Sequence, residues 1–234
     1  MSKNNRIWEI DLLRTVAIIL MIIFHTVVDL KDYYGYNIEY LRGFWYYEGK
    51  LSAIIFIFVS GISSTFSRNN LKRGLRVFMW GMVLTGVTYF YNKEYYIKFG
   101  ILHFLGISMM LYHFVNTSIK EYYFRYFFIF ATLCIVIGNI FSYVTIRLPY
   151  LFAIGLTHRE FSSMDYYPLL PWFGLFLYGA LTGKKIYEEP KSFFHTTYNC
   201  PIVSYISRHS LFIYLIHQPI ILFILYIIHS SINY

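Results

Sequence analysis

The chain has 234 residues, of which 57% are hydrophobic, 22% are aromatic and only 14% are charged. A soluble domain is usually about 45 to 50% apolar and about a quarter charged, and a disordered chain is more polar still, so both classes are excluded. Two cysteines exclude a disulfide framework. The net charge of +8 would suggest nucleic-acid binding in a soluble protein, whereas in a membrane protein it indicates anchoring charges on the cytoplasmic side.

Seven segments of the chain are long and apolar enough to cross a bilayer. The hydrocarbon core is about 30 Å thick, which requires about 20 largely apolar residues in a helix. The segments run roughly over residues 12–30, 51–66, 74–92, 99–115, 124–143, 166–183 and 208–229. A stretch from Leu148 to Leu156 is apolar but too short to span, so we expect it to be re-entrant or interfacial. The chain is therefore predicted to be an all-α, polytopic membrane bundle of about seven transmembrane helices, in one domain over residues 1–234.

Basic residues divide unevenly between the alternate connections of such a bundle. With a cytoplasmic N-terminus, that side carries Lys3, Arg6, Arg14, Arg68, Lys72, Arg73, Arg76, Lys120, Arg125, Lys184, Lys185, Lys191 and Arg208. The opposite side then carries Lys31, Arg42, Lys50, Lys93, Lys98, Arg147 and Arg159. Because Lys and Arg favour the cytoplasmic side, we expect the N-terminus to be cytoplasmic. Orientation then accounts for the positive charge, and no nucleic-acid partner is expected.

The first predicted span carries Asp11, Arg14, His25 and Asp29, although ionisable side chains inside a membrane are costly and usually functional. Arg14 and His25 are eleven residues apart, which is about three helical turns. They therefore lie on the same face of the helix, about 16 Å from each other along its axis. Asp29 follows His25 by four residues and lies on the same face. A carboxylate beside a histidine is typical of a general base, and an arginine can bind phosphate. A purely structural pairing of His25 with Asp29 is the alternative.

The loop after the second span contains Lys72, Arg73 and Arg76, the densest basic patch of the chain. These residues either fix the orientation in the membrane or contact the phosphates of an anionic cofactor. Ser60 lies in a run of small residues in the second span, FVSGISSTF. Small residues there usually allow close helix packing, and a cofactor contact is the alternative for Ser60.

Three further residues are candidates for binding the substrate. Trp45 belongs to an aromatic cluster before the second span, which is either an interfacial belt or a surface for stacking a sugar or another planar acceptor. Asp165 either binds the acceptor or caps a helix. His217 precedes Gln218 and Pro219 inside the last span, where proline frees a backbone carbonyl with which Gln218 could pair.

The sequence resembles a known family in five blocks that occur in the same order. They are RIWEIDLLRTVAIILMIIFHTVVDL, IFIFVSGISSTFSRNNLKRGLRVF, FGILHFLGIS, DYYPLLPWFGLFLYGALTGKKIY and SRHSLFIYLIHQPI. They look like bacterial proteins related to the catalytic domain of heparan-alpha-glucosaminide N-acetyltransferase, within the transmembrane acyltransferases. The broader superfamily has an arginine, ten residues and a histidine in its first span, and Arg14 and His25 match that pattern. The lysosomal enzyme itself looks to have asparagine where this chain has His25, so the heparan name is not taken as a substrate.

The resemblance implies acetyl-coenzyme A, or another acyl-coenzyme A, delivered from the cytoplasm, and an acceptor on the far side that is often a carbohydrate. We therefore expect a multi-pass acyltransferase of a bacterial cytoplasmic membrane, with His25 as base, Asp29 orienting it, and Arg14, Lys72, Arg73, Arg76 and Ser60 at the cofactor. No metal is expected, and a homo-oligomer is possible. The competing functions are a transporter or lipid-interacting protein that uses His25 and Asp29 as a proton relay, and a structural subunit of an envelope complex. The roles of His103, His113 and His217 stay open.

Overall fold

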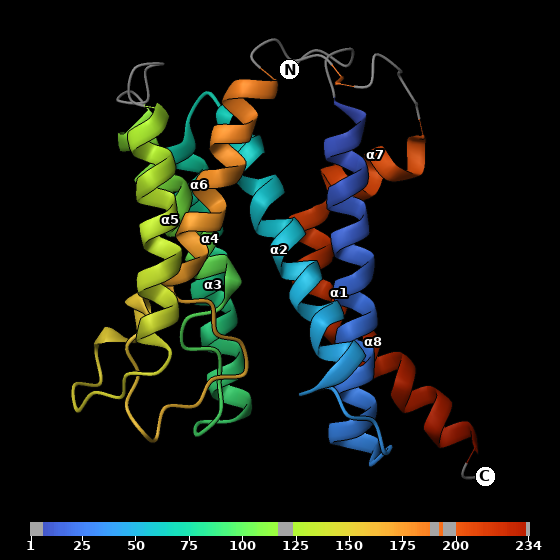
Figure 1. Cartoon of the computed structure of the whole chain (residues 1–234). Coiled ribbons are helices and arrows are strands. Elements are labelled where there is room, and N and C mark those ends of the chain that lie inside the picture. Colours follow the sequence, from blue (N-terminus) through green and yellow to red (C-terminus); the bar gives the residue numbers. More distant parts are fainter. Residues whose placement is uncertain (1–6, 117–123, 188–191, 194–199, 233–234) are drawn as a thin grey trace. The chain divides into compact units, whose positions relative to one another are not determined.

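The computed structural model of the chain describes residues 7–116, 124–187, 192–193 and 200–232. Within these residues the regular structure is helical, apart from two isolated β-bridges (Figure 1). The elements are α1 (Trp8–Tyr34), α2 (Gly43–Thr65), α3 (Asn70–Tyr91), α4 (Ile101–Asn116), α5 (Phe124–Phe141), the 3-10 turn η2 (Leu151–Ile154), α6 (Leu169–Ile186), α7 (Pro201–Arg208) and α8 (Ser210–Ile232). The predicted all-α class is confirmed.

Three of the described helices, α1, α5 and α8, are long and apolar enough to cross a membrane. The chain is therefore a membrane protein. Each of the seven predicted spans overlaps a helix, but the count of seven spans stays a prediction. The short α7 was not predicted, and the stretch from Leu148 to Leu156 forms the single turn η2. Of the basic residues used to predict the orientation, Lys3, Arg6, Lys120 and Lys191 lie outside the described residues.

The described residues divide into two compact units. In the first unit, which runs to Val59 and resumes at Ser192, α1 packs against α7 and α8. In the second unit, from Ser60 to Tyr187, α3 packs on α4, α5 packs on α6, and α4 also contacts α6 (Figure 1). Helix α2 begins in the first unit and ends in the second. The single domain expected over residues 1–234 stays a prediction.

Helix α1 ends at a left-handed glycine. Gly35 has a φ of 70°, and its N–H donates to the carbonyl of Lys31 at 3.1 Å, while the N–H of Tyr36 donates to Leu30 at 3.2 Å. This double closure satisfies carbonyls that the end of a helix would otherwise leave unpaired, and glycine adopts the left-handed conformation without steric cost. The whole length of α1 up to Tyr34 is thereby kept helical, including the turns that carry His25 and Asp29.

Among the described residues, the best-buried aromatic side chains lie in the second unit. Phe104, Tyr112 and Phe176 are fully buried, and the rings of Tyr112 and Phe176 meet edge to face at 6.1 Å between centroids.

Helix α3 begins in the second unit at Asn70, because the side chain of Asn69 accepts the backbone N–H of Lys72 at 2.9 Å. This cap fixes the position of the basic residues that follow it.

Candidate active site

One face of α1 carries the four ionisable residues that the sequence singled out, and that face packs against α7 and α8. Asp11 and Arg14 contact Ser207, His25 lies against His217, and Asp29 binds Gln218. The prediction that these residues share one helix face is therefore confirmed. All of them belong to the first unit, in which α1, α7 and α8 position the cluster.

Asp29 is held by a glutamine that comes 189 residues later in the chain. The amide nitrogen of Gln218 lies 2.7 Å from one carboxylate oxygen of Asp29 and 2.9 Å from the other. Asp29 is only 1% exposed, so this donor replaces the water that the carboxylate has lost. Within the described residues no hydrogen bond joins Asp29 to His25. The expected orientation of His25 by Asp29 is thus replaced by a pair between Asp29 and Gln218.

His25 instead faces a second histidine. The imidazole rings of His25 and His217 lie 4.9 Å apart between centroids and are tilted by 60°. The Nδ1 atom of His217 lies 2.6 Å from the carbonyl oxygen of Tyr214. Because a carbonyl can only accept, Nδ1 carries the proton, and Nε2 of the neutral ring keeps its lone pair. Two imidazoles, one of them with a fixed tautomer, therefore lie side by side between α1 and α8.

The serine hydroxyl of Ser207 joins the charges near the beginning of α1. It donates to the carboxylate of Asp11 at 2.7 Å and accepts from a guanidinium nitrogen of Arg14 at 3.0 Å. Thr15 adds a second tie between the helices, because its hydroxyl lies 3.1 Å from the carbonyl of Val203. Arg14 is half-buried at this end of the helix pair. The sequence carried one sign of the helix to which Ser207 belongs. This sign is Pro201, because proline favours the first turn of a helix.

Sequence reasoning also missed Glu48. Its side chain lies on α2 in the first unit and is 7% exposed, and neither carboxylate oxygen has a partner among the described residues. The next residue, Gly49, fits against the ring of Phe24 on α1, so this turn of α2 packs beside the turn that contains His25. The sequence carried one sign of Glu48 as a candidate, because it is a single acid inside the aromatic run FWYYEGK, next to a predicted span.

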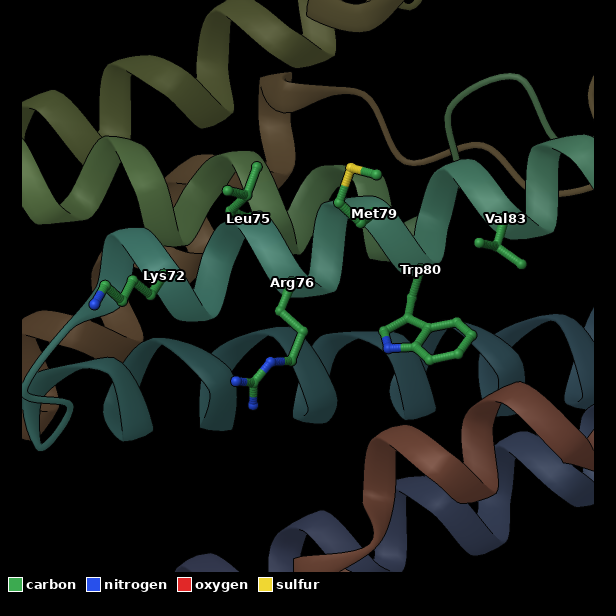
Figure 2. Close-up of a pocket in the computed structure, with 6 residues that line it drawn as sticks. All are labelled: Lys72, Leu75, Arg76, Met79, Trp80 and Val83. Carbon is green, nitrogen blue, oxygen red and sulfur yellow. The ribbon is translucent and has the colours of Figure 1, made fainter.

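Two of the predicted cofactor residues lie on an exposed face of α3 in the second unit. Figure 2 shows this face, which borders a hollow of about 470 Å³. Its lining residues recur every three or four positions, as expected for one side of a helix: Lys72, Leu75, Arg76, Met79, Trp80 and Val83. The two cations lie near the beginning of α3, and the apolar residues continue along it. The face thus combines two cations with four apolar side chains.

Two further predicted cofactor residues, Arg73 and Ser60, are engaged inside the second unit. Arg73 is half-buried and donates from its guanidinium to the carbonyl of Ser63 at 3.3 Å, which ties the beginning of α3 to the end of α2. Ser60 is 5% exposed, and its carbonyl accepts the hydroxyl of Ser64 at 2.8 Å. These contacts favour packing over a cofactor contact for Ser60, and they give Arg73 a structural bond between two helices of the second unit.

The predicted acceptor residues lie in different parts of the protein. Asp165 belongs to the second unit, where its carboxylate accepts the backbone N–H of Ile101 at 2.9 Å. It therefore caps α4, whereas the sequence suggested a cap on its own helix. Trp45 belongs to the first unit and packs edge to face on Phe44 at 5.0 Å, half-buried near the beginning of α2.

His103 is a buried histidine with both nitrogens satisfied. Its Nδ1 accepts the backbone N–H of Gly100 at 3.2 Å, and its Nε2 lies 3.2 Å from the hydroxyl of Thr85. That hydroxyl donates to the carbonyl of Ile97 at 2.7 Å, so Nε2 must supply the proton between His103 and Thr85. The ring also stacks on Phe99. These bonds give His103 a structural role within the second unit.

The described part of the chain contains no group of three or more His, Cys, Asp or Glu residues that could hold a metal ion. The chemistry offered by the first unit is that of two imidazoles and a paired carboxylate among apolar helices. Such a site can move a proton and exclude water, which are the requirements for transferring an acyl group to an amine or a hydroxyl.

Comparison with known proteins identifies the family. The model of the family described as "Heparan-alpha-glucosaminide N-acetyltransferase, catalytic" matches residues 6–219. No curated protein and no solved structure matches the chain. The match covers α1 to α6, α7 and the part of α8 that contains His217 and Gln218. The chain therefore belongs to the heparan-alpha-glucosaminide N-acetyltransferase catalytic family, a family of acetyltransferases.

Proposed function

We propose that this membrane protein transfers an acetyl group from acetyl-coenzyme A to an amine or hydroxyl acceptor, with His25 as the general base. The observation that carries the proposal is the pairing of His25 with His217, beside the buried Asp29, within a chain of an acetyltransferase family. His25 makes no hydrogen bond within the described residues, so its ring nitrogens are free to engage a substrate.

The proposed transfer conserves atoms and charge. His25 takes the proton of the acceptor N–H or O–H while the lone pair of that atom attacks the thioester carbonyl carbon. The carbon–sulfur bond then breaks, and the thiolate of coenzyme A takes the proton from the imidazolium. The products are the acetylated acceptor and free coenzyme A. Apolar helices around His25 exclude water, which would otherwise hydrolyse the thioester.

Acetyl-coenzyme A is proposed to arrive from the cytoplasm, where its phosphates require cations. Lys72 and Arg76 are exposed near the beginning of α3 in the second unit. We assign the phosphates to Lys72 and Arg76, while Arg73 and Ser60 support the helices of that unit.

The acceptor is proposed to be a carbohydrate or another envelope component on the far side of a bacterial cytoplasmic membrane. Trp45 and its aromatic neighbours lie at the end of α2 that this orientation places outside, where a planar ring could stack on a sugar. Asp165 already caps α4, so we assign acceptor recognition to the aromatic residues rather than to this carboxylate.

The experiment that tests the proposal uses the purified protein in detergent, with acetyl-coenzyme A labelled in the acetyl group and glucosamine as the probe acceptor. Acetyl transfer and the release of coenzyme A thiol are measured together. The His25→Ala variant should lose roughly 100- to 10,000-fold of the rate, the range for removal of a general base. His209→Ala is the matched control, because His209 is a half-buried histidine of the same unit whose ring lies against Tyr205. Full turnover in His25→Ala would contradict the proposal.

The same assay tests the cofactor site. The double variant Lys72→Ala/Arg76→Ala should raise KM for acetyl-coenzyme A by roughly tenfold or more, because a charge-assisted hydrogen bond contributes about 1.5 to 3 kcal/mol. Lys93→Ala removes one exposed cation just beyond the other end of α3 and should leave KM unchanged. An unchanged KM in the double variant would remove the face of α3 from cofactor binding.

The alternative is a transporter or lipid-interacting protein in which the histidines and Asp29 relay protons. Buried ionisable residues on one face of a membrane helix are also typical of proton pathways. Thermal unfolding separates the two, because a ligand at 100 times its Kd stabilises the folded protein by about 2.7 kcal/mol. Stabilisation by coenzyme A supports the transferase. No stabilisation at saturating coenzyme A, together with proton uptake by proteoliposomes, supports the transporter.

A further inference from the structure

His217 has a buried nitrogen with no hydrogen-bond partner. The residue is 8% exposed, its Nδ1 donates to the carbonyl of Tyr214, and its Nε2 is buried without any donor in the described part of the chain. Buried polar atoms in folded proteins are almost always paired, and the exceptions concentrate at functional sites. The lone pair on Nε2 therefore requires a donor that comes from a substrate or from a neighbouring side chain in another rotamer.

The contrast with His103 shows that this protein can satisfy a buried histidine completely. There, one nitrogen accepts from the backbone of Gly100 and the other donates to Thr85. At His217 the backbone of α8 satisfies only one nitrogen, and the nearest ring is that of His25, at 4.9 Å between centroids. A rotation of the His25 ring about its side-chain bonds would turn an N–H donor toward Nε2.

We propose that His217 is the residue that orients the catalytic base, by accepting a hydrogen bond from His25 at Nε2. The Tyr214 carbonyl fixes the tautomer of His217, His217 fixes the tautomer of His25, and the second nitrogen of His25 then presents its lone pair to the acceptor. His217 is thus a positioning residue. This inference rests on the proposed function, and it gives to His217 the role that the sequence had suggested for Asp29.

Asp29 is unsuited to that role because its two carboxylate oxygens already share the amide of Gln218. In the described part of the first unit, Glu48 is the buried carboxylate with neither oxygen paired. Its neighbour Gly49 packs on Phe24, but no contact joins Glu48 to the imidazole of His25 among the described residues. Glu48 is therefore the competing orienting group, and the experiment includes it.

Two substitutions of His217 separate orientation from packing. In His217→Asn the side-chain amide can still donate to the Tyr214 carbonyl, but asparagine has no atom at the position of Nε2. In His217→Gln an acceptor oxygen can reach the position of Nε2, although it cannot titrate. Acetyl transfer from labelled acetyl-coenzyme A to glucosamine is measured for both variants, with kcat and KM separated and thermal unfolding as the test of folding.

The proposal predicts that His217→Asn lowers kcat by roughly 10- to 100-fold, with little change in KM for acetyl-coenzyme A, and that His217→Gln recovers a large part of the loss. Equal activity of His217→Asn and the wild type would overturn the proposal, because acetyl transfer would then need only the hydrogen bond to Tyr214 and not the acceptor at Nε2. Loss of kcat in Glu48→Gln together with an unaffected His217→Asn would also overturn it, in favour of Glu48. An inactive wild type would instead refute the proposed function, which the His25→Ala comparison tests separately.

Discussion

The amide of Gln218 binds both carboxylate oxygens of Asp29, at 2.7 and 2.9 Å, and so joins α8 to α1 inside the membrane-spanning part of the protein. The pair also fixes the orientation of the amide, because its nitrogen must face the carboxylate. The Oε1 atom of Gln218 is then directed away from Asp29, and it is buried without a partner among the described residues. Asp29 and Gln218 thus hold α8 in register so that His217 lies against His25.

Breaking this pair from either side is predicted to destabilise the protein more than removing both partners. Gln218→Leu leaves a buried carboxylate without a donor, which should cost about 1.5 to 3 kcal/mol in the free energy of unfolding. Asp29→Leu/Gln218→Leu removes both polar groups and should be less destabilising than Gln218→Leu alone. Thermal unfolding of the purified variants in one detergent measures the difference. A double variant that unfolds at the temperature expected from the sum of the single effects would show that the pair has no coupling.

The apolar pattern of the sequence was sufficient to find the helices. Each segment predicted to span overlaps a helix, and the spacing of Arg14, His25 and Asp29 placed them on one face, because helical periodicity is a local property. The helix α7 escaped because eight residues are too few for a span, and its packing on α1 depends on contacts with residues almost the whole chain away.

The partners inside the site could not be read from the sequence. His25 and Asp29 are one turn apart, so pairing between them was the simplest local expectation. The pairs that form instead, Asp29 with Gln218 and His25 with His217, depend on the register of α8 against α1. Spacing along one helix does not determine the register between two helices, because many side chains across the contact set it together.

His103 is predicted to contribute to stability and not to acetyl transfer. His103→Leu removes both of its hydrogen bonds and leaves the N–H of Gly100 and the hydroxyl of Thr85 to find other partners, so it should destabilise by about 1 to 3 kcal/mol. The acetyl-transfer rate per folded molecule, measured well below the unfolding temperature, should stay within about twofold of the wild type. His25→Ala provides the opposite pattern, with lost activity and a small change in stability. A fall in kcat of His103→Leu without a fall in stability would place His103 in the mechanism.

Gly61 is predicted to be the glycine of α2 that the second unit cannot lose. A Cβ atom at this position would overlap the carbonyl oxygen of Phe176 and lie 2.9 Å from the backbone nitrogen of Ala180, both on α6. Because backbone atoms cannot move aside as a flexible side chain can, Gly61→Ala should force α2 and α6 apart and cost about 1 to 3 kcal/mol. Gly86 on α3 is the matched control, since no atom lies within 4 Å of its Cβ position. Gly86→Ala should leave the protein as stable or more stable, by up to about 1 kcal/mol, because alanine favours the helix. Equal unfolding temperatures for the two variants would contradict the close contact of α2 with α6.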